Sequence, residues 1–308
     1  MAADRVLTTL AAAVLFSGIA TAAFAQQLDA AAPSPEPMPG FRDGNAGARK
    51  LRYLCTGEGA PTVLIEAGGA TSFETLYSWV QTHGFRPGWL IVIPEIEKVT
   101  RVCVYDRAGL GRSGKAPSPR TSADVATDLR ALLRNEKIAT PIVCVGQSFG
   151  GSNCRIFASR YPKLIAGMVL VDTSDSDFWP RIQALLPPPA ENDSELLQLM
   201  RRGPDLTKSA ESIDLEANSA LLRKAKGIGD KPLIVLTASP TSTDAMIPPA
   251  QQQDSNRIHQ ELQRELLGLS TNSRQVIATQ AGHNIQREEP QLIVDAVLDV
   301  VKQVRSRQ

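Results

Sequence analysis

Residues 142–150 read IVCVGQSFG, a short apolar run followed by the pattern G-x-S-x-G. A helical pattern begins just after it, so the motif lies in a strand, turn and helix context. In such a turn the serine backbone is strained, and the flanking glycines keep other side chains away from the hydroxyl. The turn also raises that hydroxyl above the carboxyl ends of parallel strands, where open α/β sheets bind ligands. We therefore predict that Ser148 is a nucleophile.

The alternation of strand and helix continues on both sides of this motif. The runs that predict strands are residues 49–55, 62–66, 101–105, 141–146, 168–172, 232–238 and 275–279. The stretches that predict helices are residues 122–135, 152–160 and 291–305. Short apolar strands alternating with helices predict an α/β fold, with a mostly parallel sheet flanked by helices. The alternation fails at about residues 173–230, an irregular helical stretch that we expect to form a lid inserted above the sheet.

The composition is that of a globular protein without marked charge. Apolar residues make up 43% of the 308 residues, which is ample for a buried core. The 33 Lys and Arg nearly balance the 32 Asp and Glu, and aromatic residues make up 5%. Such a chain lacks the positive charge and the aromatic platforms typical of nucleic-acid binding. We therefore expect a small-molecule substrate and no nucleic-acid partner, and the oligomeric state stays open.

The first 25 residues have the features of a secretory signal peptide. Arg5 provides a positive charge, residues 6–24 are almost entirely apolar or small, and the run AFA at 23–25 suits signal peptidase. The alternative is an uncleaved membrane anchor, but polar residues interrupt the apolar stretch, which is short for a span. We expect cleavage, no membrane span in the mature chain, and an exported protein, periplasmic or secreted. Alternating prolines mark residues 26–48 as a linker, so the α/β domain is expected at residues 49–308.

A serine hydroxyl needs a base to accept its proton, and the chain has three histidines. His83 lies in an early predicted loop, and His259 lies in a charged helical stretch where a solvent-exposed histidine is expected. His283 follows the last predicted strand and precedes the last helix. Folds with this kind of turn place the nucleophile first and the histidine last. We therefore predict that His283 is the base and that the other two histidines take no part in the chemistry.

A third residue must orient the base and stabilise its protonated form. Asp172 ends a predicted strand, where a rigid scaffold can hold it, and Asp244 lies in a Ser/Thr/Pro-rich loop after a later strand. The later loop is the commoner place for the acid in this fold, but Asp244 lies several residues beyond its strand. We favour Asp172 and keep Asp244 as the alternative. Asp175 and Asp177 are weaker candidates that we expect to cap a lid helix.

Acyl transfer also needs hydrogen-bond donors for the oxyanion of the tetrahedral intermediate. One is predicted to be the backbone N–H of Phe149, the residue after the nucleophile. The other should come from the loop after an early strand, which reads AGGA at residues 67–70, because glycines let a backbone approach the substrate closely. We predict that Gly69 supplies this donor, with Ala70 as the alternative.

Four stretches of the sequence together resemble the α/β-hydrolase superfamily. They are VYDRAGLGRS at residues 104–113, GQSFGG at 146–151, VLVD at 169–172 and AGH at 281–283. The resemblance covers about residues 50–305 and implies a Ser-acid-His triad with no cofactor. Some members of the superfamily place the acid after the strand that follows the nucleophile unit, which favours Asp172. The usual His-Gly before the oxyanion loop is Ala67-Gly68 here, which keeps the backbone donor but removes any role of a histidine side chain.

The four cysteines contain no C-x-x-C pair, and with three histidines they predict no zinc or other metal site. The strands that carry Cys55 and Cys103 are neighbours in the strand order of the superfamily. The resemblance therefore implies a disulfide between these two cysteines, which export would permit. We expect Cys144 and Cys154 to be small buried apolar groups, and their pairing stays open.

Together these features predict an exported serine hydrolase that cleaves a carboxylic ester through an acyl-enzyme on Ser148. The same triad would also serve an amidase or peptidase, a lactonase or an acyltransferase. A serine at the turn argues against epoxide hydrolases and haloalkane dehalogenases, which use an aspartate there. The remaining alternative is a non-catalytic exported binding protein that kept the fold.

Overall fold

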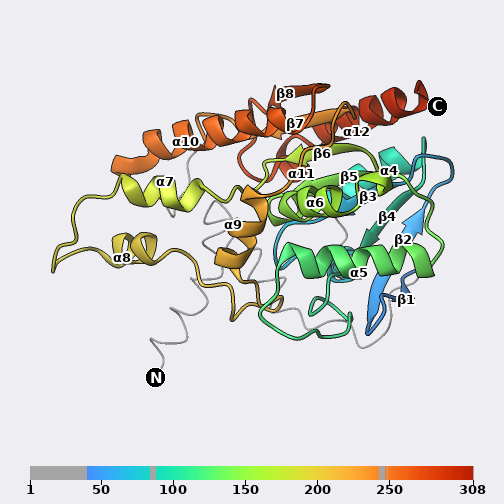
Figure 1. The fold of residues 1–308 in the computed structure, drawn as a ribbon, viewed down its shortest axis with the longest axis horizontal. Coiled ribbons are helices and arrows are strands. Elements are labelled where there is room, and N and C mark those ends of the chain that lie inside the picture. Colours follow the sequence, from blue (N-terminus) through green and yellow to red (C-terminus); the bar gives the residue numbers. More distant parts are fainter. Residues whose placement is uncertain (1–39, 84–87, 243–246, 248, 308) are drawn as a thin grey trace.

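The computed structural model describes residues 40–83, 88–242, 247 and 249–307. Within these residues the strands form one eight-stranded sheet in the order β1-β2-β4-β3-β5-β6-β7-β8 (Figure 1). The strands are β1 (Arg42–Asn45), β2 (Lys50–Thr56), β3 (Val63–Glu66), β4 (Val102–Tyr105), β5 (Ile142–Gln147), β6 (Ile165–Val171), β7 (Leu233–Thr237) and β8 (Ser273–Ile277). Strand β2 runs antiparallel to β1 and β4, and the other neighbouring pairs are parallel. The predicted α/β fold with a mostly parallel sheet is confirmed.

Helices cover both faces of the sheet. For this reason the strands β3, β4, β5 and β7 are buried along their whole length. The α-helices are α3 (Phe73–His83), α4 (Trp89–Glu97), α5 (Ser122–Asn135), α6 (Phe149–Arg160), α7 (Phe178–Ala184), α8 (Glu195–Arg202), α9 (Leu215–Arg223), α10 (Gln252–Glu265), α11 (Ile285–Glu288) and α12 (Pro290–Arg305). Short 3-10 helices lie at Pro162–Leu164, Pro249–Gln251 and Leu266–Leu269. Helices α4 and α12 pack on one face of the sheet, and α5 and α6 pack on the other (Figure 1).

The sheet begins earlier in the chain than we expected. Strand β1 lies within residues 26–48, which alternating prolines mark as a linker, and it pairs antiparallel with β2. Phe41 and Ala46, at its two ends, are buried, so this short segment gains apolar burial that composition alone did not reveal. The ordered domain therefore starts before residue 49, and the expected signal peptide lies outside the described residues.

Disulfides join all four cysteines in pairs. Cys55 and Cys103, the pair that the resemblance implied, face each other across antiparallel strands β2 and β4. Cys144 and Cys154 join β5 to α6, so this second bridge spans the turn that holds Ser148. We expected these two cysteines only as buried apolar groups. They are buried, but the turn also brings their Cα atoms within 5.9 Å, which is a normal disulfide separation.

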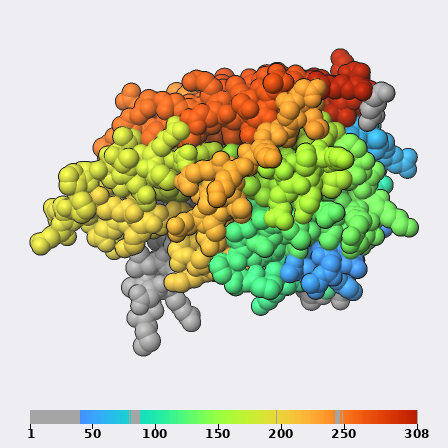
Figure 2. Space-filling model, in the orientation of Figure 1, coloured from blue at the N-terminus to red at the C-terminus, as the bar shows by residue number. Residues whose placement is uncertain are grey.

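Residues 173–230, here called the insertion, leave the sheet after β6 and return at β7, and they carry α7, α8 and α9. The insertion forms the yellow-to-orange part of Figures 1 and 2 beside the sheet. Helix α7 packs on α10 through a small apolar core made of Ile182, Met200, Ile247, Ile258 and Leu262. Nearer the C-terminal end of the insertion, Ile213 forms a parallel β-bridge with Arg120 of the sheet domain. Among the helices of the described residues, none combines the length and the apolar character needed to cross a bilayer.

Candidate active site

Ser148 lies at the sharp turn between β5 and α6. Its backbone has φ 53° and ψ −123°, a conformation that a residue with a side chain adopts only under strain. Its N–H donates to the carbonyl oxygen of Val171 at 3.1 Å. A side chain at Gly150 would overlap the carbonyl oxygens of Glu66 and Ala67, so the turn packs closely against the loop after β3. The strained turn that we expected at Ser148 is therefore present.

Asp172 follows β6, the strand beside β5, and it also has a positive φ, of 42°. Its Oδ2 lies 2.6 Å from Nδ1 of His283. An ionised carboxylate only accepts hydrogen bonds, so His283 donates through Nδ1–H and keeps Nε2 as an acceptor. The side chain of Asp172 is 2% exposed and that of His283 is 14% exposed, so bulk water screens the pair weakly. The structure thus brings together two of the three residues that we predicted for the triad.

The other oxygen of Asp172 contacts a histidine that we had excluded. Nε2 of His259 lies 2.7 Å from Oδ1 of Asp172, and the same oxygen accepts the N–H of Ala238 at 2.8 Å. The expectation that His259 is solvent-exposed is wrong, since its side chain is only 25% exposed. The physical reason is that α10 carries its charges on one side and turns the other side inward. The buried residues on that inner side are Ser255, Ile258, Leu262 and Gln263. His83, expected in a loop, is the last residue of α3.

Asp172 and His259 act on each other's ionisation. Burial raises the pKa of Asp172, but the charge of His259 and the hydrogen bonds from His259 and His283 outweigh it and hold that pKa well below its usual range. Burial lowers the pKa of His259, but the charge and hydrogen bond of Asp172 outweigh this effect and raise it. Asp172 is therefore ionised at neutral pH, and His259 binds a proton more readily than a free histidine does.

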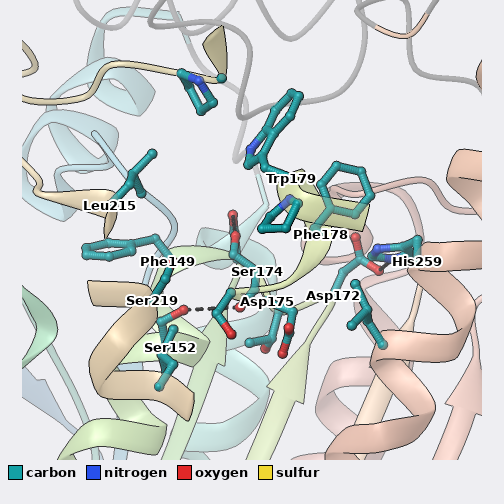
Figure 3. Close-up of a pocket in the computed structure, with 18 of the residues that line it drawn as sticks. Phe149, Ser152, Asp172, Ser174, Asp175, Phe178, Trp179, Leu215, Ser219 and His259 are labelled. Atoms are coloured by element: carbon teal, nitrogen blue, oxygen red, sulfur yellow. Dashed lines mark hydrogen bonds and ion pairs between the residues drawn. The ribbon is translucent and has the colours of Figure 1, made fainter. Parts of the chain in front are cut away.

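These side chains line one cavity of about 540 Å³. Its polar wall includes Ser148, Asp172, Ser174, His259 and His283. Its apolar wall includes Phe149, Phe178, Trp179, Leu215 and Leu222. In Figure 3, Phe178 and Trp179 of α7 lie above Asp172 and His259. Across the ranges that the structure describes, no cluster of three or more His, Cys, Asp or Glu side chains is placed to hold a metal ion.

The hydroxyl of Ser148 and the imidazole of His283 each have another neighbour. Oγ of Ser148 lies 3.2 Å from Oγ of Ser174. Nε2 of His283 lies 3.3 Å from the side-chain amide nitrogen of Gln147, which donates to it. Both contacts are at the long end of the hydrogen-bond range, so they are easily exchanged. Proton transfer would need Ser148 Oγ to approach His283 Nε2, and catalytic hydrogen bonds often tighten only when substrate binds.

The other candidate acids have different surroundings. Asp244 lies outside the described residues. Asp175 forms an ion pair with Arg155 at 3.1 Å, and Asp177 forms one with Arg223 at 3.0 Å. Asp177 stands at the N-cap position of α7, but its side chain makes no cap hydrogen bond there. These two aspartates therefore join neighbouring segments through arginines and do not cap the helix as we expected.

The loop after β3, where we predicted the second oxyanion donor, is held by a buried arginine. Arg107 donates to the carbonyl oxygens of Ala67 at 2.8 Å and Gly68 at 2.7 Å. It also forms an ion pair with Glu66 at 3.3 Å, and both side chains are almost fully buried. Burial raises the pKa of Glu66 against the opposing charge of Arg107. The backbone of this loop is therefore fixed from the protein side.

Glu211, in the insertion, joins the buried ion pair of Arg107 and Glu66. Its carboxylate pairs with Arg107 at 2.5 Å and accepts the backbone N–H of Ala70 at 2.7 Å. The N–H of Ala70 is thus engaged with Glu211. This leaves the N–H of Gly69 as the better candidate for the second oxyanion donor. The first candidate is the N–H of Phe149, at the start of α6. The sequence carried no clear signal for Glu211, a single acidic residue in an irregular stretch. The sequence did carry a signal for His259. The i, i+3 and i+4 spacing of Ser255, Ile258, His259 and Leu262 marks one helix face.

Comparison with known proteins agrees with this fold. A family model described as the alpha/beta hydrolase fold matches residues 61–226, more than half of the chain. The chain belongs to the α/β-hydrolase family. It is 27% identical over 244 residues to the uncharacterized protein YqjL of Bacillus subtilis (strain 168), covering 79% of this chain and 85% of that protein.

Two solved structures illustrate how widely this α/β-hydrolase fold is shared. One is a serine hydrolase involved in carbazole degradation, the CarC enzyme, with a TM-score of 0.55, 20% identity, and coverage of 85% of this chain and 98% of that chain. The other is a thermophilic esterase from Thermogutta terrifontis, with a TM-score of 0.54, 20% identity, and coverage of 87% and 99%. At this level of identity the likeness concerns the fold.

Proposed function

We propose that this α/β-hydrolase is a serine hydrolase that cleaves a carboxylic ester. Ser148 Oγ attacks the carbonyl carbon while His283 Nε2 takes its proton, and Asp172 stabilises the resulting imidazolium. The proton then passes to the leaving alcohol, and an acyl-enzyme remains. Water, activated by His283, releases the acid and restores Ser148.

The observation that carries the proposal is the 2.6 Å contact between Asp172 and His283 in the cavity that Ser148 also lines. An ionised, buried aspartate fixes the tautomer of His283 so that its other nitrogen, Nε2, can act as a base. The strained backbone of Ser148 supports the same assignment, because strain of this kind is found at functional sites. For the oxyanion we propose the backbone N–H groups of Phe149 and Gly69 as donors.

The cavity supports a small substrate with an apolar part. Its volume of about 540 Å³ is within the range of ligand sites. Phe178 and Trp179, from the insertion, supply aromatic surface beside the triad (Figure 3). We propose that the insertion acts as a lid over an acyl or alcohol group. Two disulfides also support the proposed export, because such bridges persist in oxidising compartments.

The test is turnover by the purified mature protein of p-nitrophenyl esters, lactones and peptide amides, with Ser148→Ala as the paired variant. Ester turnover that Ser148→Ala abolishes is the expected result. Turnover confined to amides or lactones, or seen only with an acceptor other than water, would replace the ester assignment while keeping the triad. Activity that survives Ser148→Ala would overturn the assignment of the nucleophile.

A further inference from the structure

Asp172 has two imidazole donors, one on each carboxylate oxygen. His283 donates to Oδ2 at 2.6 Å, and His259 donates through Nε2–H to Oδ1 at 2.7 Å. The N–H of Ala238 adds a third donor, to Oδ1, at 2.8 Å. A triad of serine, histidine and aspartate needs only the first of these contacts. The second histidine is therefore an addition that the proposed mechanism does not use.

Helix α10 is fixed so that His259 faces Asp172. The amide of Gln260 donates to the carbonyl oxygen of Ala238 at 2.9 Å. The amide of Gln263 donates to the carbonyl oxygen of Thr173 at 2.7 Å and accepts the N–H of the same residue at 3.3 Å. These bonds tie the helix to the residues that follow β6 and β7. In Figure 3, His259 lies directly beside Asp172.

Among the described residues, Asp172 is the charged group that contacts His259. On its other side the ring of Phe178, on α7, lies edge-to-face at 6.3 Å. His283 is the other titratable group near Asp172. Arg181 of α7 forms ion pairs with glutamates on the exposed side of α10. The remaining charged residues of the cavity wall are Asp175, Arg202, Glu216 and Arg223.

We propose that His259 is a positioning residue whose own protonation sets how strongly Asp172 supports His283. This inference rests on the proposed function. Neutral His259 gives Asp172 one hydrogen bond and no charge. Protonated His259 places a cation on the same carboxylate, and one negative charge cannot fully compensate two imidazolium ions. Because the reaction puts a proton on His283, it proceeds best when His259 is neutral.

A two-step loss of activity toward acid pH follows from this arrangement. As the pH falls, proton binding by His259 first lowers kcat/KM to an intermediate level, about tenfold below the alkaline plateau if the coupling is near one pKa unit. Further acidification then abolishes the remaining activity, because the proposed mechanism needs an unprotonated base. The pKa of His259 is raised by Asp172 against the effect of burial, so the first step lies above the ordinary histidine value of 6.5.

The experiment is the pH profile of kcat/KM for the wild type, His259→Gln and the control Arg257→Gln. The Gln variant keeps a neutral donor for Asp172 but cannot bind the proton, so its profile should lose the first step. Arg257 lies on the exposed side of α10 in ion pairs with Asp254 and Glu261, so its variant should keep the two-step profile. A His259→Gln profile that overlays the wild type would overturn the proposal.

A second experiment, which needs no turnover, separates this inference from the proposed function. The imidazole signals of the inactive Ser148→Ala protein can be titrated by NMR, with and without Asp172→Asn. We expect the midpoint of His259 to fall by at least one pH unit when Asp172 loses its charge. An unchanged midpoint would overturn the coupling even in an active enzyme. A shifted midpoint in a protein without esterase activity would reject the proposed function alone and keep the coupling.

Discussion

Two buried carboxylate clusters lie on either side of β5, the strand that directly precedes Ser148, and they differ in their partners. On the β6 side, Asp172 is held by two histidines. On the β3 side, Glu66 and Glu211 are held by one arginine, Arg107. Both clusters fix backbone next to the same turn. Their partners differ in one property, which is whether they can lose a proton near neutral pH.

This difference separates the two tasks of the proposed enzyme. Histidine changes its charge between pH 5 and 8, whereas arginine stays charged throughout. Burial lowers the pKa of Arg107, but the charge and hydrogen bonds of its carboxylates outweigh it and raise that pKa further above the working range. Acid-base function, with its pH sensitivity, is thus placed on the β6 side. The loop after β3, where we propose an oxyanion donor, is held by an arginine that stays charged over this pH range.

The largest expected effect comes from removing the charge on the β6 side. Asp172→Asn keeps the shape of the side chain but removes the charge that stabilises the imidazolium, so we expect kcat to fall by roughly 10³- to 10⁴-fold. Asp254→Asn, on the exposed side of α10 and outside the cavity, serves as the control and should change kcat little. Should Asp244→Asn abolish turnover while Asp172→Asn does not, the acid has been misassigned.

A smaller effect is expected on the β3 side. Glu211→Ala removes the acceptor of the Ala70 N–H and leaves Arg107 partly unpaired, so the oxyanion loop loses its support. We expect kcat to fall about 10²-fold with little change in KM, since the oxyanion forms only in the transition state. Breaking a buried ion pair should also lower the free energy of unfolding by about 3–5 kcal/mol.

Glu211→Gln sharpens the comparison, because it keeps an acceptor for the Ala70 N–H and removes only the charge. Its kcat should lie between those of the wild type and Glu211→Ala, and the midpoints of its pH profile should match those of the wild type. Glu195→Gln, on exposed helix α8 of the same insertion, is the control. A shifted pH midpoint in Glu211→Gln would show that the two clusters are not separate.

The smallest effect on turnover is expected from the disulfide that spans the turn shared by both clusters. Replacing Cys144 and Cys154 together by alanine opens a short loop, worth roughly 2–3 kcal/mol of unfolding free energy in the chain-entropy model. Below the unfolding transition we expect kcat to stay within a fewfold of the wild type, because packing against Glu66 and Ala67 still holds the turn. Denaturant titrations of both proteins measure the difference. Equal stability would mean that the bridge does not constrain the unfolded chain.

Much of the fold, and the grouping of the residues that we propose for the site, could be predicted from the sequence for a local reason. Ser148 and Asp172 each directly follow a strand, and His283 lies in the loop between β8 and α11, and such places are marked by short apolar runs and by glycine. The structure brings these three to one cavity. Helix α10 misled us, because we weighed its many charged residues above the i, i+3 and i+4 spacing that marks its inner face.

Other features depended on contacts far apart in the chain. Glu211 meets Ala70 across 141 positions, and no local pattern announces such a pair. Strand β1 exists because β2 offers it an edge, so a segment that looks like a linker becomes ordered. The pairing of Cys144 with Cys154 depends on the geometry of the turn between them. In each case tertiary contacts decide the structure, and secondary-structure propensity and periodicity do not reveal those contacts.

The central claim is that Ser148 is the activated nucleophile of this site. Its most direct test is reaction of the folded protein with a fluorophosphonate, followed by intact mass and peptide mapping. We predict a single adduct on Ser148, absent from Ser148→Ala and strongly slowed in Asp172→Asn, with circular dichroism showing that all three proteins are folded. A folded wild type that takes up no label, or a label carried by Ser174 instead, would contradict the account.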